Sequence, residues 1–431
     1  MFLRVRRGGS VPPWFSFPVT IHKKEFHIPK FCNFVRNPGK MIPFEIALET
    51  VLSCKYATGT EKVPLTSALG RVLAEDIRSD IDMPPFNKSA VDGYACCRRD
   101  IFNELEIIEV IAAGKAPEKI ISDNQCAKIM TGAMIPQGAD CVLMVEHTEK
   151  SGENSIKFIK ADTAANIAYA AEDVKKGSLV LEKGILIKPE HIAILAAVGC
   201  YETEVSLQPK VSIISTGDEL VEPYQIPGAS QIRNSNSWQL LAQAQQMHVK
   251  VKYEGIARDD EEITRHMLED ASETSDVVLL TGGVSMGDFD FVPEMMMKTG
   301  FEILFRTIAI QPGKPTVCGR KDNKICFGLP GNPVASFVIF ELLVKPLLYK
   351  MMGCEFSPRL LRMPFAHEYK RRISERLSVI PVVINSDGTV ESVSYHGSAH
   401  IHALAYANGM AFIPIGKAVV EKGEFIDVRF I

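Results

Sequence analysis

Asp-Val-Val-Leu-Leu-Thr-Gly-Gly-Val-Ser-Met-Gly-Asp-Phe-Asp, residues 276–290, joins an apolar run to a turn that is rich in glycine. The apolar run has the length and composition of a fully buried strand. The turn after it contains three glycines, Gly282, Gly283 and Gly287, which tolerate positive φ and let backbone N–H groups close around an oxyanion. The stretch therefore predicts an anion site at the end of a strand in an α/β sheet.

The same turn carries one hydroxyl and two acids, Ser285, Asp288 and Asp290. Two carboxylates next to a bare phosphate repel it, so their presence predicts Mg²⁺ or another cation between the acids and the anion. The alternative is a tight connection from a strand to a helix whose acids are only solvated.

The segments around this turn alternate between strand and helix patterns. Strands are predicted at 211–215, 249–256 and 277–281, and helices at 238–247, 261–271 and 334–349. This alternation predicts a doubly wound, mostly parallel α/β sheet with helices on both faces. Ligands of such sheets bind beyond the carboxyl ends of the strands, where the glycine turn lies.

Three further segments are expected at that edge of the sheet. Residues 215–220 supply hydroxyls and the acid Glu219, and residues 311–315 place Lys314 at the end of a rigid turn. Residues 328–333 end in Pro330, Gly331, Asn332 and Pro333, where Asn332 suits an N-cap and Pro333 the first helical turn. Together the four segments predict a site for a nucleotide or phosphate-type ligand.

The rest of the chain divides into smaller domains, as 431 residues lead us to expect. We predict a discontinuous linking domain of helical and mixed structure (41–80 and 165–208), a β-rich second domain (81–164), the α/β domain (209–352) and a C-terminal β-barrel-like domain (353–431). Residues 1–40 are basic, which fits either a targeting arm or, as we favour, an extension without function.

Composition excludes several classes of protein. The formal net charge of -4 gives no general nucleic-acid surface, and no apolar run reaches the length of a membrane span. The ten cysteines have no CxxC spacing, which favours reduced thiols and a cytoplasmic protein.

Several blocks, taken in order, resemble the molybdopterin molybdenumtransferase family, which also includes the C-terminal domain of gephyrin. The matching blocks are 84–86, 89–95, 131–133, 172–173, 215–220, 282–287 with Asp290, 312–315 and 328–333. The resemblance runs from about Met41 to the C-terminus. It implies a homodimer of four-domain subunits whose active site lies between the α/β domain of one subunit and the β-rich domain of the other.

The resemblance also implies a reaction and a set of residues. With Mg²⁺, molybdate attacks adenylylated molybdopterin, AMP leaves, and molybdenum is bound by the two sulfurs of the pterin; an upstream molybdopterin adenylyltransferase is a further expected partner. The implied catalytic residues are Asp92, Thr131, Asp173, Glu219, Asp259 and Asp290. The implied substrate-binding residues are Gly282, Gly283, Ser285, Gly287, Lys314, Pro330, Gly331, Asn332, Pro333 and Ser398, and the metal ligands are Glu219, Asp288 and Asp290.

Several basic residues of the family pattern are replaced here. The departures are Ala168 and Ala170 before Glu172-Asp173, Thr307, Gln311, Pro381, and Asn87-Lys88 in place of Asp-Asn. Two hypotheses follow: a working enzyme in which Lys88, Arg306 and Lys314 supply charge from new positions, or a degenerate paralogue that binds a pterin nucleotide or a partner protein without turnover. The retained acids favour the first, and a gephyrin-like scaffold is less favoured.

Overall fold

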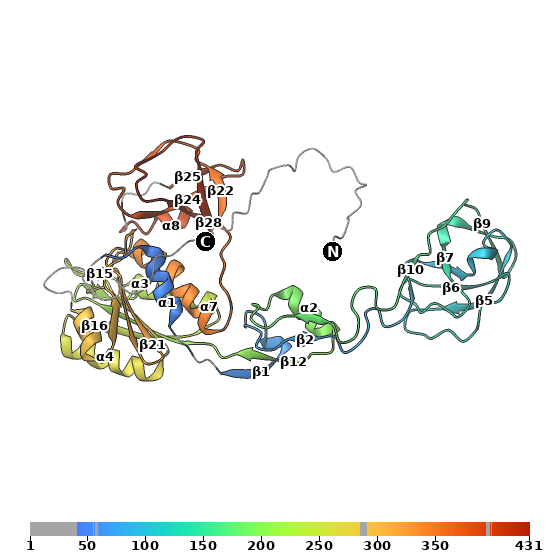
Figure 1. Ribbon diagram of the computed structural model, residues 1–431, viewed down its shortest axis with the longest axis horizontal. Helices are drawn as coiled ribbons and strands as arrows, with labels where there is room; N and C mark the ends of the chain where they lie inside the picture. The colour runs from blue at the N-terminus through green and yellow to red at the C-terminus, as the bar shows by residue number, and fades with distance from the viewer. Residues whose placement is uncertain (1–40, 55, 57–58, 285–290, 394–396, 398) are drawn as a thin grey trace. The chain divides into compact units, whose positions relative to one another are not determined.

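The chain folds into two compact units. The computed structural model describes residues 41–54, 56, 59–284, 291–393, 397 and 399–431, and the basic segment 1–40 lies outside this part (Figure 1). One unit is Gly59–Leu207, and the other combines the described residues before Gly59 with those of Gln208–Ile431. Among the described helices, none is both long enough and apolar enough to cross a membrane.

The larger unit contains a six-stranded sheet. Its order is β16 (Lys250–Ala257), β13 (Lys210–Thr216), β17 (Val277–Thr281), β21 (Lys324–Leu329), β20 (Val317–Lys321) and β18 (Glu302–Phe305). The first four strands are parallel, whereas β20 and β18 are antiparallel to their neighbours. The register sets Ser215 opposite Thr281 and Thr281 opposite Leu329, so three strands end at one edge.

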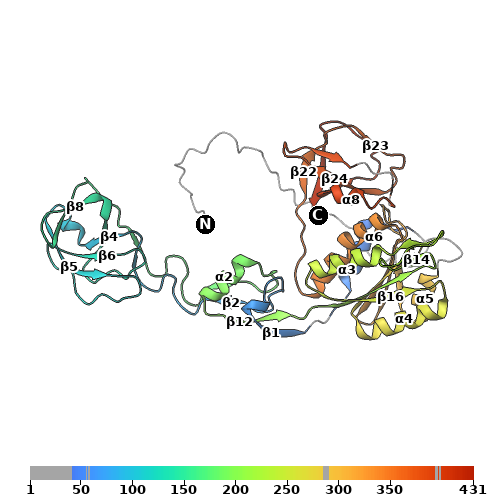
Figure 2. The ribbon, with the colours of Figure 1, turned by 180° about the vertical axis from the view of Figure 1, so that it is seen from behind.

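Helices cover both faces of this sheet, which confirms the predicted α/β architecture. On one face α3 (Asn236–Gln246) packs against α6 (Pro333–Ile339), and on the other α4 (Glu261–Thr274) packs against α5 (Val292–Lys298) (Figure 2). The core beneath α4 and α5 includes the buried apolar residues Ile214, Leu280 and Cys326. The helices are amphipathic, so their apolar sides pack on these apolar strand faces and their polar sides face away from the sheet.

The helix predicted at 334–349 has three parts. A π-helical turn, Phe340–Val344, separates α6 from α7 (Lys345–Met351). Helix α1 (Phe44–Ser53) packs against α7 and this turn with a buried face that includes Ala47 and Val51. The residues of α1, which the sequence placed in the linking domain, therefore pack with the α/β domain.

The prediction missed α5 and the strands β18, β20 and β21. Strands β20 and β21 form a hairpin whose turn contains Asp322 at a φ of 53°. Charged residues at the ends of the hairpin, Arg320, Lys321 and Lys324, interrupt the apolar run that would mark a buried strand. Helix α5 is only seven residues long, too short for a clear helical period.

A second six-stranded sheet forms the C-terminal β-domain. Its order is β19 (Ile310–Gln311), β24 (Leu377–Ile384), β26 (Gly409–Ile413), β28 (Phe425–Phe430) and β22 (Leu361–Pro364), and β25 (Val390–Ser392) also pairs with β24. A short ribbon of β23 (Tyr369–Lys370) and β27 (Val419–Val420) and the helix α8 (Ala403–Tyr406) complete it. Since β19 belongs to the α/β chain segment, its pairing with β24 ties the two domains of this unit together.

The smaller unit, Gly59–Leu207, is rich in β-structure. Its main sheet has the order β7 (Cys141–Met144), β4 (Gly93–Cys96), β6 (Gln125–Ile129), β5 (Leu105–Ile111), β9 (Ser155–Phe158) and β8 (Thr148–Lys150). Strand pairs β3 (Lys88–Ser89) with β10 (Ile167–Ala168), β1 (Thr60–Pro64) with β12 (Glu202–Ser206), and β2 (Ile77–Arg78) with β11 (Leu179–Leu181) accompany α2 (Pro189–Ala197). A separate apolar core that includes Leu73, Leu195 and Val205 lies under α2.

Candidate functional site

A hollow of about 320 Å³ lies at the carboxyl edge of the parallel strands. It is lined by the ends of β13 and β17, the turn before α6, the segment before α3 and two residues of the C-terminal domain. The lining residues are Ser215, Thr216, Glu219, Leu220, Ile232, Arg233, Asn234, Ser235, Asn236, Thr281, Gly282, Gly331, Asn332, Pro333, Ala399 and Ile401. The predicted site residues Glu219, Gly282, Gly331, Asn332 and Pro333 thus come together here.

Gly282 occupies a position that only glycine fits. Its φ is 100°, and a Cβ atom there would lie 2.6 Å from the carbonyl oxygen of Thr216. The N–H of Gly282 donates to the carbonyl of Leu329 at 3.1 Å. The sequence predicted that this N–H would bind an oxyanion, whereas the structure uses it to hold β17 against the end of β21.

Glu219 folds back over its own turn. Gly217 has a φ of 139°, and a Cβ atom at that position would lie 2.5 Å from Oε2 of Glu219. The backbone carbonyl of Glu219 accepts the N–H of Ile232 at 2.8 Å, where β14 (Leu220–Val221) pairs with β15 (Ile232–Arg233). Glycine at 217 therefore makes room for the carboxylate at the hollow, and Arg233 on β15 adds a cation to the lining.

Two asparagines organise the floor of the hollow. Nδ2 of Asn236 donates to Oγ1 of Thr281 at 3.0 Å and to the carbonyl of Gly331 at 2.7 Å, which ties the end of β17 to the turn before α6. Oδ1 of Asn234 accepts the hydroxyl of Ser215 at 3.0 Å. From the sequence, this Asn-Ser-Asn segment was predicted only to precede a helix. The available signal was the presence of two asparagines directly before a helix of the α/β domain.

The predicted catalytic residue Asp259 does not line the hollow. It forms a reciprocal pair with Asp218, in which each backbone N–H donates to the other's carboxylate at 3.3 Å. Arg258 donates to the backbone carbonyl of Asp218 at 3.1 Å. The turns after β13 and β16 are joined in this way, and both carboxylates are exposed.

The other predicted residues of this unit have different outcomes. Lys314 is exposed and does not line the hollow, and Pro330 is buried. Asn332 is the N-cap of α6 and Pro333 opens the helix, as predicted, although Asn332 makes no side-chain capping hydrogen bond. Gly283 does not line the hollow, and the described part of the turn ends at Val284, so that Ser285, Gly287, Asp288, Asp290 and Ser398 lie outside the described residues. Within the described part, no group of three or more His, Cys, Asp or Glu side chains is arranged to hold a metal ion.

A second group of predicted residues lies in the smaller unit. Oδ1 of Asp92 accepts both the backbone N–H of Thr131 at 2.7 Å and its hydroxyl at 2.9 Å. These two bonds, the backbone one first, lower the pKa of Asp92 below its usual value. The loop is held to β3 by the N–H of Gly132, which donates to the carbonyl of Ser89 at 2.8 Å.

Two of the replaced basic positions, Ala168 and Ala170, lie in the same unit as Asp92 and Thr131. Ala168 on β10 is directly opposite Lys88 on β3, so the side chains of the two positions leave the same face of the ribbon. The backbone N–H of Ala170 donates to Oδ1 of Asn87 at 2.9 Å. Asp173 is exposed, and its N–H donates to the carbonyl of Met83 at 3.1 Å. The smaller unit thus gathers Asp92, Thr131 and a lysine near one loop.

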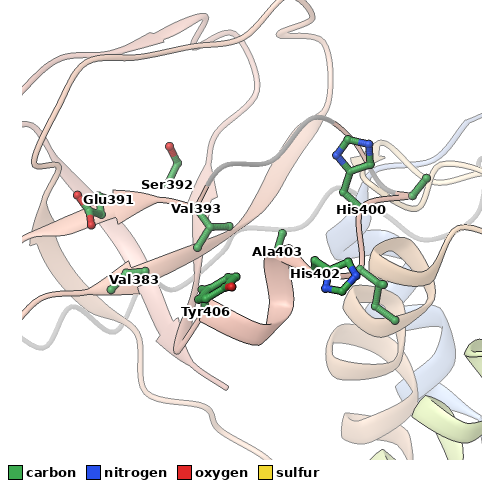
Figure 3. Close-up of a pocket in the computed structure, with 10 residues that line it drawn as sticks. Val383, Glu391, Ser392, Val393, His400, His402, Ala403 and Tyr406 are labelled. Carbon is green, nitrogen blue, oxygen red and sulfur yellow. The ribbon is translucent and has the colours of Figure 1, made fainter.

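A larger hollow, of about 610 Å³, lies in the C-terminal domain. Figure 3 shows Val393, Ala403 and Tyr406 between Val383, Glu391 and Ser392 on one side and His400 and His402 on the other. Ala399 and Ile401 line both hollows, so one segment separates them. Because the larger hollow is mostly apolar and lies away from the strand ends, we assign the chemistry to the smaller one.

Comparison with known proteins gives three matching families along the chain. Residues 42–199 match the MoeA N-terminal region (domain I and II), residues 212–350 a probable molybdopterin binding domain, and residues 370–431 the MoeA C-terminal region (domain IV).

Whole-length relatives agree with these matches. The chain is 33% identical to a molybdopterin molybdenumtransferase of Staphylococcus aureus, over 91% of this chain and 96% of that protein. It is 37% identical to that of Staphylococcus epidermidis, over 89% and 94% respectively. The crystal structure of a molybdopterin biosynthesis moeA protein from Pyrococcus horikoshii OT3 superposes with a TM-score of 0.78 at 31% identity, covering 91% of this chain and all of that one.

Proposed function

The chain belongs to the molybdopterin molybdenumtransferase family, and we propose that it inserts molybdenum from molybdate into adenylylated molybdopterin and releases AMP. Its role is that of a transferase in molybdenum cofactor biosynthesis. The observation that carries the proposal is the hollow at the strand ends, where hydroxyls, a carboxylate, a cation and a helix start converge.

The hollow has the parts that an oxyanion and a pterin nucleotide require. Thr216 offers a hydroxyl, Arg233 a positive charge, and the turn at Gly331 leads directly into α6. Asn236 keeps that turn in place through its two hydrogen bonds. Donors that are fixed before the substrate arrives stabilise charge that develops during the reaction, because they need not reorganise.

We propose Mg²⁺ as the cation of this site. Carboxylate oxygen is the ligand type that Mg²⁺ prefers, and Glu219 presents its carboxylate at the hollow in space that the missing Cβ of Gly217 leaves free. We keep Asp288 and Asp290 as further proposed ligands on sequence grounds. When bound, Mg²⁺ would neutralise the phosphate of the adenylylated substrate.

Asp92 and Thr131 supply a second set of groups. Since hydrogen bonds from Thr131 lower the pKa of Asp92, this carboxylate stays ionised at physiological pH and its second oxygen remains available as an acceptor. Lys88 supports the hypothesis of a working enzyme, because it lies directly opposite Ala168, one of the replaced basic positions. Lys88 on β3 would then supply the positive charge that the family pattern places on the neighbouring segment around Ala168.

One observation favours the alternative, a paralogue that binds a pterin nucleotide without turnover. Gln311 stands where the family commonly has a lysine, and its Oε1 atom is buried without a hydrogen-bond partner. A neutral side chain there binds molybdate less strongly than a cation does. The two functions differ in turnover and share nucleotide binding.

The test is reconstitution with adenylylated molybdopterin, molybdate and Mg²⁺. We expect AMP release by the wild type and a loss on the order of 100-fold or more in Glu219→Gln, which keeps the size of the side chain but loses its charge. Nucleotide binding without AMP release in the wild type would refute the enzyme and support the binding paralogue. We also propose a homodimer and a contact with the upstream adenylyltransferase.

A further inference from the structure

The site hollow is lined from two domains of the larger unit. Ala399 and Ile401 belong to the C-terminal domain, and the other lining residues belong to the α/β domain. The hollow keeps its shape only while the two domains hold a fixed position. One tie between them is the pairing of β19 with β24, where Gln311 is opposite Ser378.

A buried ion pair provides a second tie. Nη2 of Arg429 on β28 donates to Oε2 of Glu341 at 2.7 Å, and Nη1 donates to the backbone carbonyl of Glu341 at 3.3 Å. Glu341 is 4% exposed and Arg429 is 6% exposed. Lys345, one turn further along the helix, donates to the same carboxylate oxygen at 2.9 Å. The acid therefore has two cations, of which only Arg429 comes from the other domain.

Hydrogen bonds continue from this ion pair to the hollow. Nε2 of Gln243 on α3 donates to Oε1 of Glu341 at 3.1 Å and to the carbonyl of Phe337 at 3.4 Å. One turn earlier, Nε2 of Gln239 donates to the carbonyl of Pro333 at 3.4 Å. Gln243 and Gln239 thus bond to successive turns of the neighbouring helix, from Glu341 back to Pro333, and Pro333 lines the hollow.

We propose that Glu341 and Arg429 are positioning residues, which hold the C-terminal segment of Ala399 and Ile401 over the hollow and fix the first turn of α6. This inference rests on the proposed function, in which the hollow receives molybdate. A buried charge pair is a costly way to gain stability, because desolvation offsets its attraction, whereas its directed hydrogen bonds define one arrangement of the two domains. A π-helical turn places Glu341 where all three side-chain donors reach it.

The test compares Arg429→Met with Lys345→Met. Each variant removes one cation from the same oxygen of Glu341, but only Arg429→Met removes a contact between domains. We expect Arg429→Met to raise the KM for molybdate on the order of tenfold or more with a smaller effect on kcat, because small displacements of binding groups are costly. Lys345→Met should change the KM by less than about threefold, because it removes only an ion pair between residues of the same helix.

Hydrogen–deuterium exchange gives a readout that does not depend on turnover. Peptides covering residues 399–406 should exchange faster in Arg429→Met than in the wild type, and at the wild-type rate in Lys345→Met. Arg429→Lys keeps the charge and should restore part of the protection. If Arg429→Met does not fold, Arg429→Lys takes its place in the comparison with Lys345→Met.

Equal effects of the Arg429 and Lys345 variants on both KM and exchange would overturn the proposal, because the pair would then contribute only charge balance. Unchanged exchange at 399–406 in both Arg429 variants would overturn it as well. If the wild type releases no AMP, the proposed function fails, and the exchange comparison alone then decides the positioning role.

Discussion

At the scale of single residues, the most informative position is Gly217. A side chain there would meet Oε2 of Glu219 at 2.5 Å, within the turn that presents this carboxylate at the hollow. Gly217→Ala should therefore displace Glu219 and raise the Mg²⁺ concentration for half-maximal AMP release on the order of tenfold.

The matched control is Gly353→Ala. Gly353 also has a positive φ, 77°, but a Cβ atom there meets nothing within 4 Å. It should lose about 1–2 kcal/mol of stability from backbone strain and keep the wild-type Mg²⁺ requirement. An equal rise in both variants would show that strain, and not Glu219, is responsible.

Asp92 gives a second prediction at this scale. Thr131→Val removes the hydroxyl bond and keeps the backbone bond, so the pKa of Asp92 should rise part of the way to its usual value, as ¹³C NMR of the carboxyl group would show. A depressed pKa keeps the charged form as pH falls, so the acid limb of AMP release should move to higher pH in the variant.

The C-terminal domain contains an equivalent pair as control. Thr389 donates its hydroxyl and its N–H to Asp387, and these two bonds, the hydroxyl one first, lower the pKa of that carboxyl. Thr389→Val should raise the pKa of Asp387 and leave the pH profile of AMP release unchanged. If the profile moves equally in both variants, Asp92 has no special part in the reaction.

At the scale of elements, Asn236 joins β17 to the start of α6. Asn236→Ala leaves the Thr281 hydroxyl and the Gly331 carbonyl without this donor, so we expect a loss of about 1–3 kcal/mol in urea unfolding and weaker nucleotide binding. Ser235→Ala is the control, because Ser235 also lines the hollow but makes no capping bond. Its unfolding free energy should stay within about 0.5 kcal/mol of the wild type. A similar loss in the two variants would contradict the bridging role of Asn236.

The elements of the α/β domain were predicted from the sequence more fully than the contacts of its site. The apolar run of β17 predicted a buried strand, and the alternation of strands and helices predicted the α/β sheet, because both patterns are local. Asn236 was missed because its partners are 45 and 95 residues away in the chain. The sequence correctly marked position 282 as one that requires glycine, but it attributed this to the binding of an oxyanion. In the structure the requirement comes from the contact with Thr216, which depends on the register of β13 and β17.

At the scale of the whole molecule, the larger unit carries Glu219 and the smaller unit carries Asp92. If the protein is the homodimer that the family resemblance implies, these residues act from different subunits. Asp92→Asn and Glu219→Gln should each be inactive alone. Mixing and reassembling the two should restore about a quarter of wild-type AMP release, since half of the dimers are mixed and each of those has one intact site. No recovery from verified mixed dimers would place both residues in one subunit's site.

The most direct measurement of the central claim follows molybdenum itself. The wild type is incubated with adenylylated molybdopterin, molybdate and Mg²⁺, and molybdenum bound to the pterin is quantified by mass spectrometry beside released AMP. We predict one molybdenum atom bound to the pterin for each AMP released by the wild type, and neither product from Glu219→Gln. AMP release without molybdenum on the pterin, or no AMP release from the wild type, would contradict the assignment as a working molybdenumtransferase.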